Sequence, residues 1–409
     1  MRHRNCQFIS AWFTVFALLL VVGCERESEP EALVLKVGVI ASLSGPEPLA
    51  ATATVESARV IADYYNEQGG FEIDGERYRI ELLVMDDAGD PVRAVEIASD
   101  FVRAGDVHYV IGPEEDVMCE AVAPVLDSAG ILYVYYGFSH PLLKGASCGV
   151  LGGPRPIQLF SSIADYLQET QEDLSVCVLA GNSRPAMHQK LKVEKMVEAA
   201  GMNVVRFSRF DVTEEVFDPL DAPASIRSCM ARLVSKNPDT VILCGQRHGT
   251  LSLALSYLRG SGFTGTVIAR EPQSSNDFQQ VRLMADELLL VGSSVLIDER
   301  SDYYLDLKNR YLDRDLEWGA DVDLKLYALE SLLRGIAQCG RDALTSSGPL
   351  VDLIGSIEFV DPFLMDERIM GFVSRGSSLT HQQLSVPILI SKYSGAEVEV
   401  VHRSYLSFE

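Results

Sequence analysis

The sequence predicts an α/β protein with two lobes, each containing a parallel β-sheet covered by helices on both faces. Strand-like and helix-like segments alternate along the chain in two successive series, the order that builds doubly wound parallel sheets. The length of 409 residues and the hydrophobic content of 47% suit two globular domains of ordinary size. No long linker or low-complexity tract interrupts the body, so we expect the lobes to be hinged together.

Each element is predicted from its hydrophobic period and from the glycines and prolines that bound it. The first series has strands at residues 33–43, 78–85, 109–111 and 131–135, a helix that ends near residue 66, and a helix that closes at Gly130. The second series has strands at residues 174–180, 202–207, 240–244, 265–269 and 288–296, with helices at 154–170, 187–200, 223–236 and 251–258. Two further helices are expected at residues 302–311 and 324–339.

The charge balance limits the partners of the folded body. The formal net charge is −23 at pH 7, and the basic residues form no cluster. A surface of this sign repels nucleic acid and anionic lipid, so neither is expected to bind.

The first 24 residues form a segment of their own. Arg2 and Arg4 precede a largely apolar run that ends in Val22, Gly23 and Cys24. This pattern resembles a signal peptide, residues 1–23, with a lipobox that makes Cys24 the lipidated first residue of an acidic tether over residues 24–34. Removal of residues 1–23 takes away two arginines, so the mature charge would be −23 − 2 = −25. An ordinary signal peptide or a membrane anchor is the other interpretation, although the apolar run is short for a membrane span.

Export would place the remaining cysteines in an oxidising compartment, where pairs can form disulfides. Cys119 and Cys148 flank the central segment described next, and a bridge between them could brace the rim of a site. Cys177 and Cys244 lie inside apolar strands, where a buried free thiol is expected. No cysteine or histidine spacing matches a zinc site, and no metal or cofactor is expected.

The segment between residues 108 and 143 locates the expected ligand site. Residues 109–111 form a short buried strand that stops at Gly112 and Pro113, and the strand at residues 131–135 stops at a turn. In an open parallel sheet, ligands bind outside the carboxyl ends of such strands, close to helix N-termini. We therefore expect a ligand at these two strand ends.

Three motifs of this chain follow a known pattern. The first is GVI followed by LSGP at residues 38–46, and the second is a strand that ends in DD before DP at residues 86–91. The third runs from GP at residue 112 through AGI at residue 129 to HP at residue 140. Together they resemble the leucine/isoleucine/valine-binding family of periplasmic solute receptors, which have the type I periplasmic binding protein fold.

The resemblance implies two doubly wound lobes joined by a three-stranded hinge, with chain crossings near residues 150, 293 and 384. The first lobe would contain residues 35–150 and 293–384, and the second lobe residues 151–292 and 385–409. The resemblance is strongest over residues 35–143 and weakest after residue 361.

In the family, residues after two strands of the first lobe hold the carboxylate of an amino acid. By position, Asp116 stands where the family usually has a serine, and Ser139 where it has a threonine. The first-lobe side of the expected site is completed by Ser44, Gly137 and Phe138.

Local chemistry offers other roles for residues near this site. Three acids, Glu114, Glu115 and Asp116, precede or open the helix and would oppose a ligand carboxylate, unless Asp116 only caps the helix and the glutamates face water. Asp90 before Pro91 likewise suits a helix cap without any ligand. Tyr136 and Phe138 are expected either at the cleft or packed in the core.

For the second lobe, the resemblance implies contacts from the loops after residues 244 and 270. Arg247 replaces a tyrosine that packs on the ligand in the family, whereas Glu271 keeps a glutamate that pairs with the ligand ammonium. Arg247 could grip a ligand carboxylate or pair with Glu271, and Arg270 offers Glu271 another partner.

No catalytic motif is present, and the seven histidines stand in no recognised arrangement, so we do not expect an enzyme. The resemblance implies an exported, lipid-anchored receptor that closes on a small amino-acid-like ligand and delivers it to an ABC permease in the membrane. A ligand-sensing or regulatory envelope lipoprotein, or a scaffold that lost its ligand, is the alternative.

Overall fold

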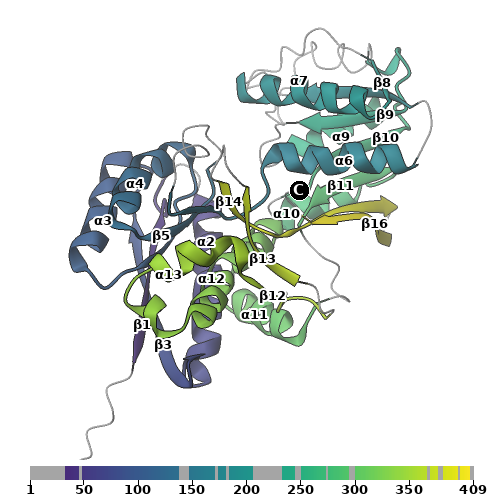
Figure 1. The fold of residues 1–409 in the computed structure, drawn as a ribbon. Helices are drawn as coiled ribbons and strands as arrows, with labels where there is room; N and C mark the ends of the chain where they lie inside the picture. The colour runs from purple at the N-terminus through teal and green to yellow at the C-terminus, as the bar shows by residue number, and fades with distance from the viewer. Residues whose placement is uncertain are drawn as a thin grey trace, which may run out of the picture.

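The computed structural model shows two α/β lobes connected by several chain crossings, with lobe 1 at the lower left and lobe 2 at the upper right of Figure 1. It describes residues 33–45, 48–137, 147–170, 174–180, 184–205, 233–244, 250–272, 275–293, 300–365, 369–375, 381–394 and 397–405. All structural statements below concern these residues.

The sheet of lobe 1 has nine strands within the described residues, in the order β12-β13-β14-β6-β5-β4-β1-β3-β2. The strands from β14 to β3 pair in parallel, whereas β2 and the β12–β13–β14 group pair antiparallel at the two edges. The strands are β1 (Val34–Ala41), β2 (Phe71–Ile73), β3 (Glu76–Asp86), β4 (Tyr109–Ile111), β5 (Leu132–Tyr135), β6 (Gly149–Leu151), β12 (Glu358–Val360), β13 (Ile369–Arg375) and β14 (His381–Leu384).

Helices cover both faces of this sheet because side chains of a strand alternate between its two faces. From β1, Val37 and Val39 pack in the core beneath α2, α11 and α12, whereas Ile40 packs in the core beneath α3 and α4. The helices of this lobe are α2 (Pro48–Glu67), α3 (Pro91–Ala104), α4 (Asp116–Ala129), α11 (Asp302–Leu312), α12 (Ala320–Cys339) and α13 (Gly348–Leu353), with 3₁₀ turns at Gly340–Leu344 and Ile354–Ser356.

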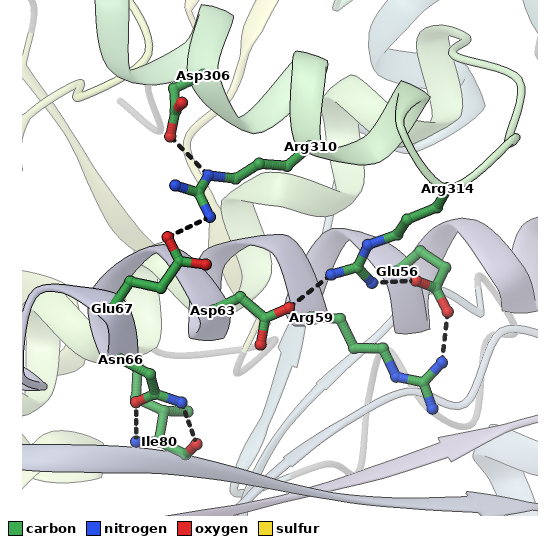
Figure 2. A network of polar contacts seen from close by, with 9 residues as sticks. All are labelled: Glu56, Arg59, Asp63, Asn66, Glu67, Ile80, Asp306, Arg310 and Arg314. Atoms are coloured by element: carbon green, nitrogen blue, oxygen red, sulfur yellow. Dashed lines mark hydrogen bonds and ion pairs between the residues drawn. The ribbon is translucent and has the colours of Figure 1, made fainter.

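The outer surfaces of α2 and α11 are joined by ion pairs (Figure 2). Arg314, just after α11, contacts Glu56 at 2.5 Å and Asp63 at 2.6 Å, and Arg310 contacts Glu67 at 2.8 Å. These side chains are partly exposed, so each pair contributes little stability by itself. The network nevertheless fixes α11, which the chain reaches only after crossing back from lobe 2, against the N-terminal helix of lobe 1.

Lobe 2 repeats the architecture with a smaller sheet. Its seven described strands have the order β16-β15-β11-β10-β9-β7-β8, parallel from β8 to β11 and antiparallel at β15 and β16. The strands are β7 (Ser175–Ala180), β8 (Asn203–Val204), β9 (Thr240–Cys244), β10 (Thr266–Arg270), β11 (Leu288–Gly292), β15 (Pro387–Ser394) and β16 (Glu397–Tyr405). The helices are α6 (Pro156–Thr170), α7 (Arg184–Ala199), α9 (Thr250–Gly260) and α10 (Ser275–Arg282).

The chain passes between the two sheets three times: from β6 to α6, from β11 to α11, and from β14 to β15. Two of these crossings are joined by Gln383, whose buried side-chain amide donates to the Gly153 carbonyl at 2.9 Å and to Oε1 of Gln158 at 3.0 Å. A buried amide that is satisfied in this way resists separation of the crossings.

The predicted two-lobe α/β fold is confirmed, but several elements were not predicted. The hairpin between β2 and β3 turns at Asp74 and Gly75, both with positive φ, which is the geometry that an Asp-Gly pair favours. The antiparallel edge strands after residue 357 were not predicted either. Most of the helix expected at residues 223–236 lies outside the described residues and stays a prediction.

Gly112 directly follows β4, at the carboxyl edge of the lobe-1 sheet. Its φ is 89°, and a Cβ atom at this position would overlap the Ile40 carbonyl oxygen of β1. Gly130, at the end of α4, also has a positive φ, 66°, but has open space around it. Gly112 is therefore required by space as well as by conformation.

We expect Gly112→Ala to destabilise the protein much more than the control Gly130→Ala. The control carries only the left-handed backbone cost of roughly 1–2 kcal/mol. The overlap with β1 should add at least about 2 kcal/mol to the loss at Gly112. Urea denaturation of both variants measures the difference, and equal losses would show that β4 and β1 can separate without cost.

Candidate functional site

The carboxyl ends of β1 and β3 are joined by two serine–aspartate contacts. Ser44 donates its hydroxyl to Oδ2 of Asp86 at 2.6 Å and its backbone N–H to Oδ1 at 3.2 Å. Beneath it, Ser42 donates to the buried Asp87 at 2.6 Å. The Ser44 hydrogen bond is the main reason that the pKa of Asp86 lies below its usual value. Ser44, an expected ligand residue, thus directs its hydroxyl hydrogen to the end of β3.

The start of α3 shows the local role of the second acidic motif. Asp90 is the N-cap residue of α3, and its side chain accepts the backbone N–H of Val92 at 2.9 Å. Pro91 follows at the first helical position, where its missing N–H is not needed. The capping interpretation of Asp90 is confirmed.

The start of α4 differs from the capping alternative considered for Asp116. The N-cap residue is Glu115, whose side chain makes no capping hydrogen bond, and Asp116 is the exposed first residue of the helix. An acid in the first turn favours the helix through its dipole. The interpretation of Asp116 as the cap is therefore wrong by one position.

Glu114 occupies the centre of the lobe-1 site. Its carboxylate accepts the hydroxyl of Thr54 from α2 and forms an ion pair with the ammonium of Lys325 from α12. Only 9% of the Glu114 side chain and 2% of the Lys325 side chain is exposed to solvent. A charged pair is thus buried at the end of the sheet, where a ligand was expected.

Tyr136 completes this cluster from the end of β5. The Lys325 ammonium lies 3.0 Å from the centroid of its ring, a cation–π contact. Gly152 makes room for the ring, because a Cβ atom there would overlap it. Tyr136 is 6% exposed, and its hydroxyl has no hydrogen-bond partner within the described part of the chain.

The electrostatics of the cluster favour uncharged acids. Burial raises the pKa of Glu114, the Lys325 ammonium opposes this shift, and Asp321 of α12 adds to it. Burial also raises the pKa of Tyr136, with further contributions from Glu114 and Asp321. The Lys325 ammonium is the group that opposes this rise in the pKa of Glu114 most strongly.

The described part of the lobe-2 site centres on Glu271, directly after β10. Its backbone N–H donates to the Val291 carbonyl at 2.9 Å, and its half-buried side chain lies against Gly292 of β11, where a Cβ atom would overlap the carboxylate. Burial and then the charge of Glu271 raise the pKa of Tyr393 on β15. Glu271 therefore stands at the carboxyl ends of the lobe-2 strands.

Beneath the same edge of lobe 2, Lys190 and Glu194 of α7 form a second buried ion pair with a separation of 3.1 Å. Burial is the main cause of the raised pKa of the Cys244 thiol at the end of β9. The charge of Lys190 lowers this pKa, and the charge of Glu194 raises it. This pair was not predicted, although a lysine and a glutamate four residues apart on one helix are placed to form an ion pair.

Comparison with known proteins identifies the family. A sequence profile described as periplasmic binding protein matches residues 34–314. The chain belongs to this family. Two relatives are Leu/Ile/Val-binding protein homolog 3 of Brucella melitensis, 24% identical over 251 residues, and Leu/Ile/Val-binding protein BraC3 of Rhizobium johnstonii, 27% identical over 248 residues. Each match covers 60% of this chain and 63% of the relative's length.

Solved structures of periplasmic binding proteins share the fold. The branched-chain amino acid transporter substrate-binding protein LivJ from Streptococcus pneumoniae, solved in complex with isoleucine, has a TM-score of 0.65 and 17% identity, over 91% of this chain and 99% of LivJ. An ABC transporter solute-binding protein from R. palustris, in complex with benzoate, has a TM-score of 0.65 and 15% identity, over 92% and 98% of the two chains.

Only some of the predicted site residues of this periplasmic binding protein fall within the part of the chain that the structure describes. Ser44 and Asp116 lie at the carboxyl edge of lobe 1, Gly137 is buried just after β5, and Glu271 lies at the corresponding edge of lobe 2. Four of the predicted residues lie outside the described residues: Phe138, Ser139, Arg247 and the lipidation residue Cys24.

The bridge considered between Cys119 and Cys148 is not formed. Both cysteines are buried free thiols. The Cys119 sulfur, in the first turn of α4, donates to the carbonyl of Pro113 in the preceding loop at 3.3 Å, and the Ser147 hydroxyl lies 3.9 Å from the Cys148 sulfur. Cys177 and Cys244 are also buried and form no disulfide, as predicted.

Within the described parts of the chain, no helix has the length and apolar character of a membrane span. No group of three or more histidine, cysteine, aspartate or glutamate side chains in those parts is placed to hold a metal ion.

We expect Lys325→Met to destabilise the protein by about 3–5 kcal/mol, because it leaves the Glu114 carboxylate buried without its cation. The double variant Glu114→Gln/Lys325→Met should recover most of this loss. The control Lys392→Met removes a half-exposed pair with Glu287 and should cost at most about 1 kcal/mol. Chemical denaturation at pH 7 measures all three.

The loss in Lys325→Met should shrink as the pH falls. A carboxyl group with a folded-state pKa above its unfolded value contributes stability below the unfolded pKa and loses it as the pH rises through the folded pKa. Without Lys325 the pKa of Glu114 rises further, so acidification neutralises the uncompensated charge. A loss that is independent of pH would contradict this account of the pair.

Proposed function

We propose that this protein is an extracytoplasmic solute-binding protein that captures a small amino-acid-like ligand between its lobes and delivers it to an ABC permease. Membership of the periplasmic binding protein family supports the proposal. The observation that carries it is the arrangement of polar groups, among them Ser44, Glu114, Tyr136 and Glu271, at the carboxyl edges of two sheets joined by three crossings. Ligands of open α/β sheets bind at this edge.

The names of related proteins support the ligand class. Two relatives are named for binding leucine, isoleucine and valine, and LivJ was solved with isoleucine. Another structure of the same fold holds benzoate, so a shared fold leaves the ligand open. The ligand class therefore has to be inferred from the chemistry of the site residues and not from the fold.

A ligand should raise the thermal stability of the purified protein. At 100 times its dissociation constant, a ligand that binds only the folded state adds roughly 2.7 kcal/mol. We expect such a shift with at least one compound in a panel of amino acids, their amides and short carboxylates. A panel without any shift would count against a receptor for amino-acid-like ligands.

We also propose that Cys24 carries a lipid that anchors the protein, which is supported by the apolar run before Val22, Gly23 and Cys24. Cys24→Ala should release the protein from membranes or block its maturation. Membrane fractionation after a salt wash measures this. A Cys24→Ala protein that stays as membrane-bound as the parent would rule out lipidation at this residue.

The lobe-2 contacts can be tested separately. If Arg247 and Glu271 hold the ligand, Arg247→Ala and Glu271→Gln should each weaken its binding by more than threefold, about 0.7 kcal/mol, in isothermal titration. Glu287→Gln is the matched control, because Glu287 precedes β11 at the opposite edge of the same sheet and pairs with Lys392. Affinities within threefold of the parent for both variants would remove these residues from the site.

A further inference from the structure

The Glu114 side chain crosses the open end of the lobe-1 sheet. Glu114 belongs to the loop that leads from β4 into α4, and α4 covers the sheet face that includes Ile40. Its carboxylate nevertheless contacts Thr54 of α2 and Lys325 of α12, which cover the opposite face. The ion pair therefore spans the crevice in which ligands of open α/β sheets bind.

The single ammonium of this cluster is already engaged on two sides. Lys325 contacts the Glu114 carboxylate and the face of the Tyr136 ring. The half-buried Asp321, in the first turn of α12, lies close enough to act on the pKa of both Glu114 and Tyr136. A ligand carboxylate placed here would meet like charges and no available cation within the described residues.

Tyr136 supplies a second and independent observation. Its side chain is more than nine-tenths buried, its ring lies against Lys325, and its hydroxyl has no hydrogen-bond partner within the described segments. A buried hydroxyl without a partner is costly, so such groups are uncommon unless a ligand or water completes them. The hydroxyl can donate to, or accept from, an uncharged polar group.

We propose that Glu114 takes the place of a ligand carboxylate on Lys325, so that lobe 1 selects ligands whose inner end is an uncharged hydrogen-bonding group such as a carboxamide. The inference rests on the proposed receptor function and names its ligand class. Tyr136 contributes the hydroxyl that binds the amide. Glu114 and Lys325 determine specificity, because their pairing occupies the ammonium that would otherwise bind an acid.

The test compares amide and acid partners of the same size on the purified protein. Leucinamide with leucine, and benzamide with benzoate, differ only at the group that lobe 1 would meet. Isothermal titration should show at least tenfold tighter binding of the amide in a pair that binds. Acids that bind the parent as tightly as their amides would overturn the inference and leave the receptor function standing. A failure of both members of every pair, and of the wider panel, would overturn both.

Variants locate the preference in the cluster. Glu114→Gln frees Lys325 and should raise the affinity for the acid at least tenfold, and the double variant Glu114→Gln/Lys325→Met should abolish that gain. Glu56→Gln is the matched control, because it removes one carboxylate from the outer side of α2, in the network with Arg314 (Figure 2), and should leave the amide-to-acid ratio unchanged.

Tyr136→Phe tests the amide preference without changing a charged residue, so it can be used even if the Glu114 variants do not fold. It removes only a hydroxyl without a described partner, so the fold should be retained while amide binding falls at least tenfold. Unchanged amide binding by Tyr136→Phe, or an unchanged acid affinity in a folded Glu114→Gln protein, would overturn the assignment of lobe 1.

Discussion

The buried ion pair between Glu114 and Lys325 is the constraint on which the lobe-1 site depends. It joins two residues that are 211 positions apart in the sequence. Thr54 and Tyr136 then add α2 and β5 to the same cluster. Because Lys325 belongs to α12, which the chain forms only after its return from lobe 2, the site is complete only when the discontinuous lobe has assembled.

The Glu114–Lys325 pair is not expected to be present for its contribution to stability. Buried ion pairs often contribute less stability than apolar groups of the same volume, since both charges lose their hydration. The outer network of Arg310 and Arg314 is different, because its partly exposed charges keep much of their hydration and act mainly to hold α11 on α2. The Glu114–Lys325 pair costs hydration free energy and lies at the carboxyl end of the lobe-1 sheet, where ligands bind. A role in ligand recognition therefore explains it better than a role in stabilising the fold.

The sequence predicts the parts of this protein that depend on local patterns. Alternating strands and helices, the Asp90 cap and the strand end at Gly112 all follow from spacing and residue type, and all are present. Lys325 could not be found in this way, because a lysine among apolar helix positions looks like an ordinary surface residue until its partner is known. The position of Asp116 was misleading for a related reason, since Glu114, two residues earlier, reaches the opposite helices and Asp116 is the exposed first residue of α4. Ion pairs between residues that are distant in the sequence can be identified only once the fold is known.

If lobe 1 selects uncharged groups, Glu114 remains paired with Lys325 while a ligand is bound. A crystal structure of the protein with its bound ligand tests this most directly. We expect an intact Glu114–Lys325 pair, with an uncharged ligand group hydrogen-bonded to the Tyr136 hydroxyl. A ligand carboxylate in contact with Lys325, with Glu114 displaced, would contradict it.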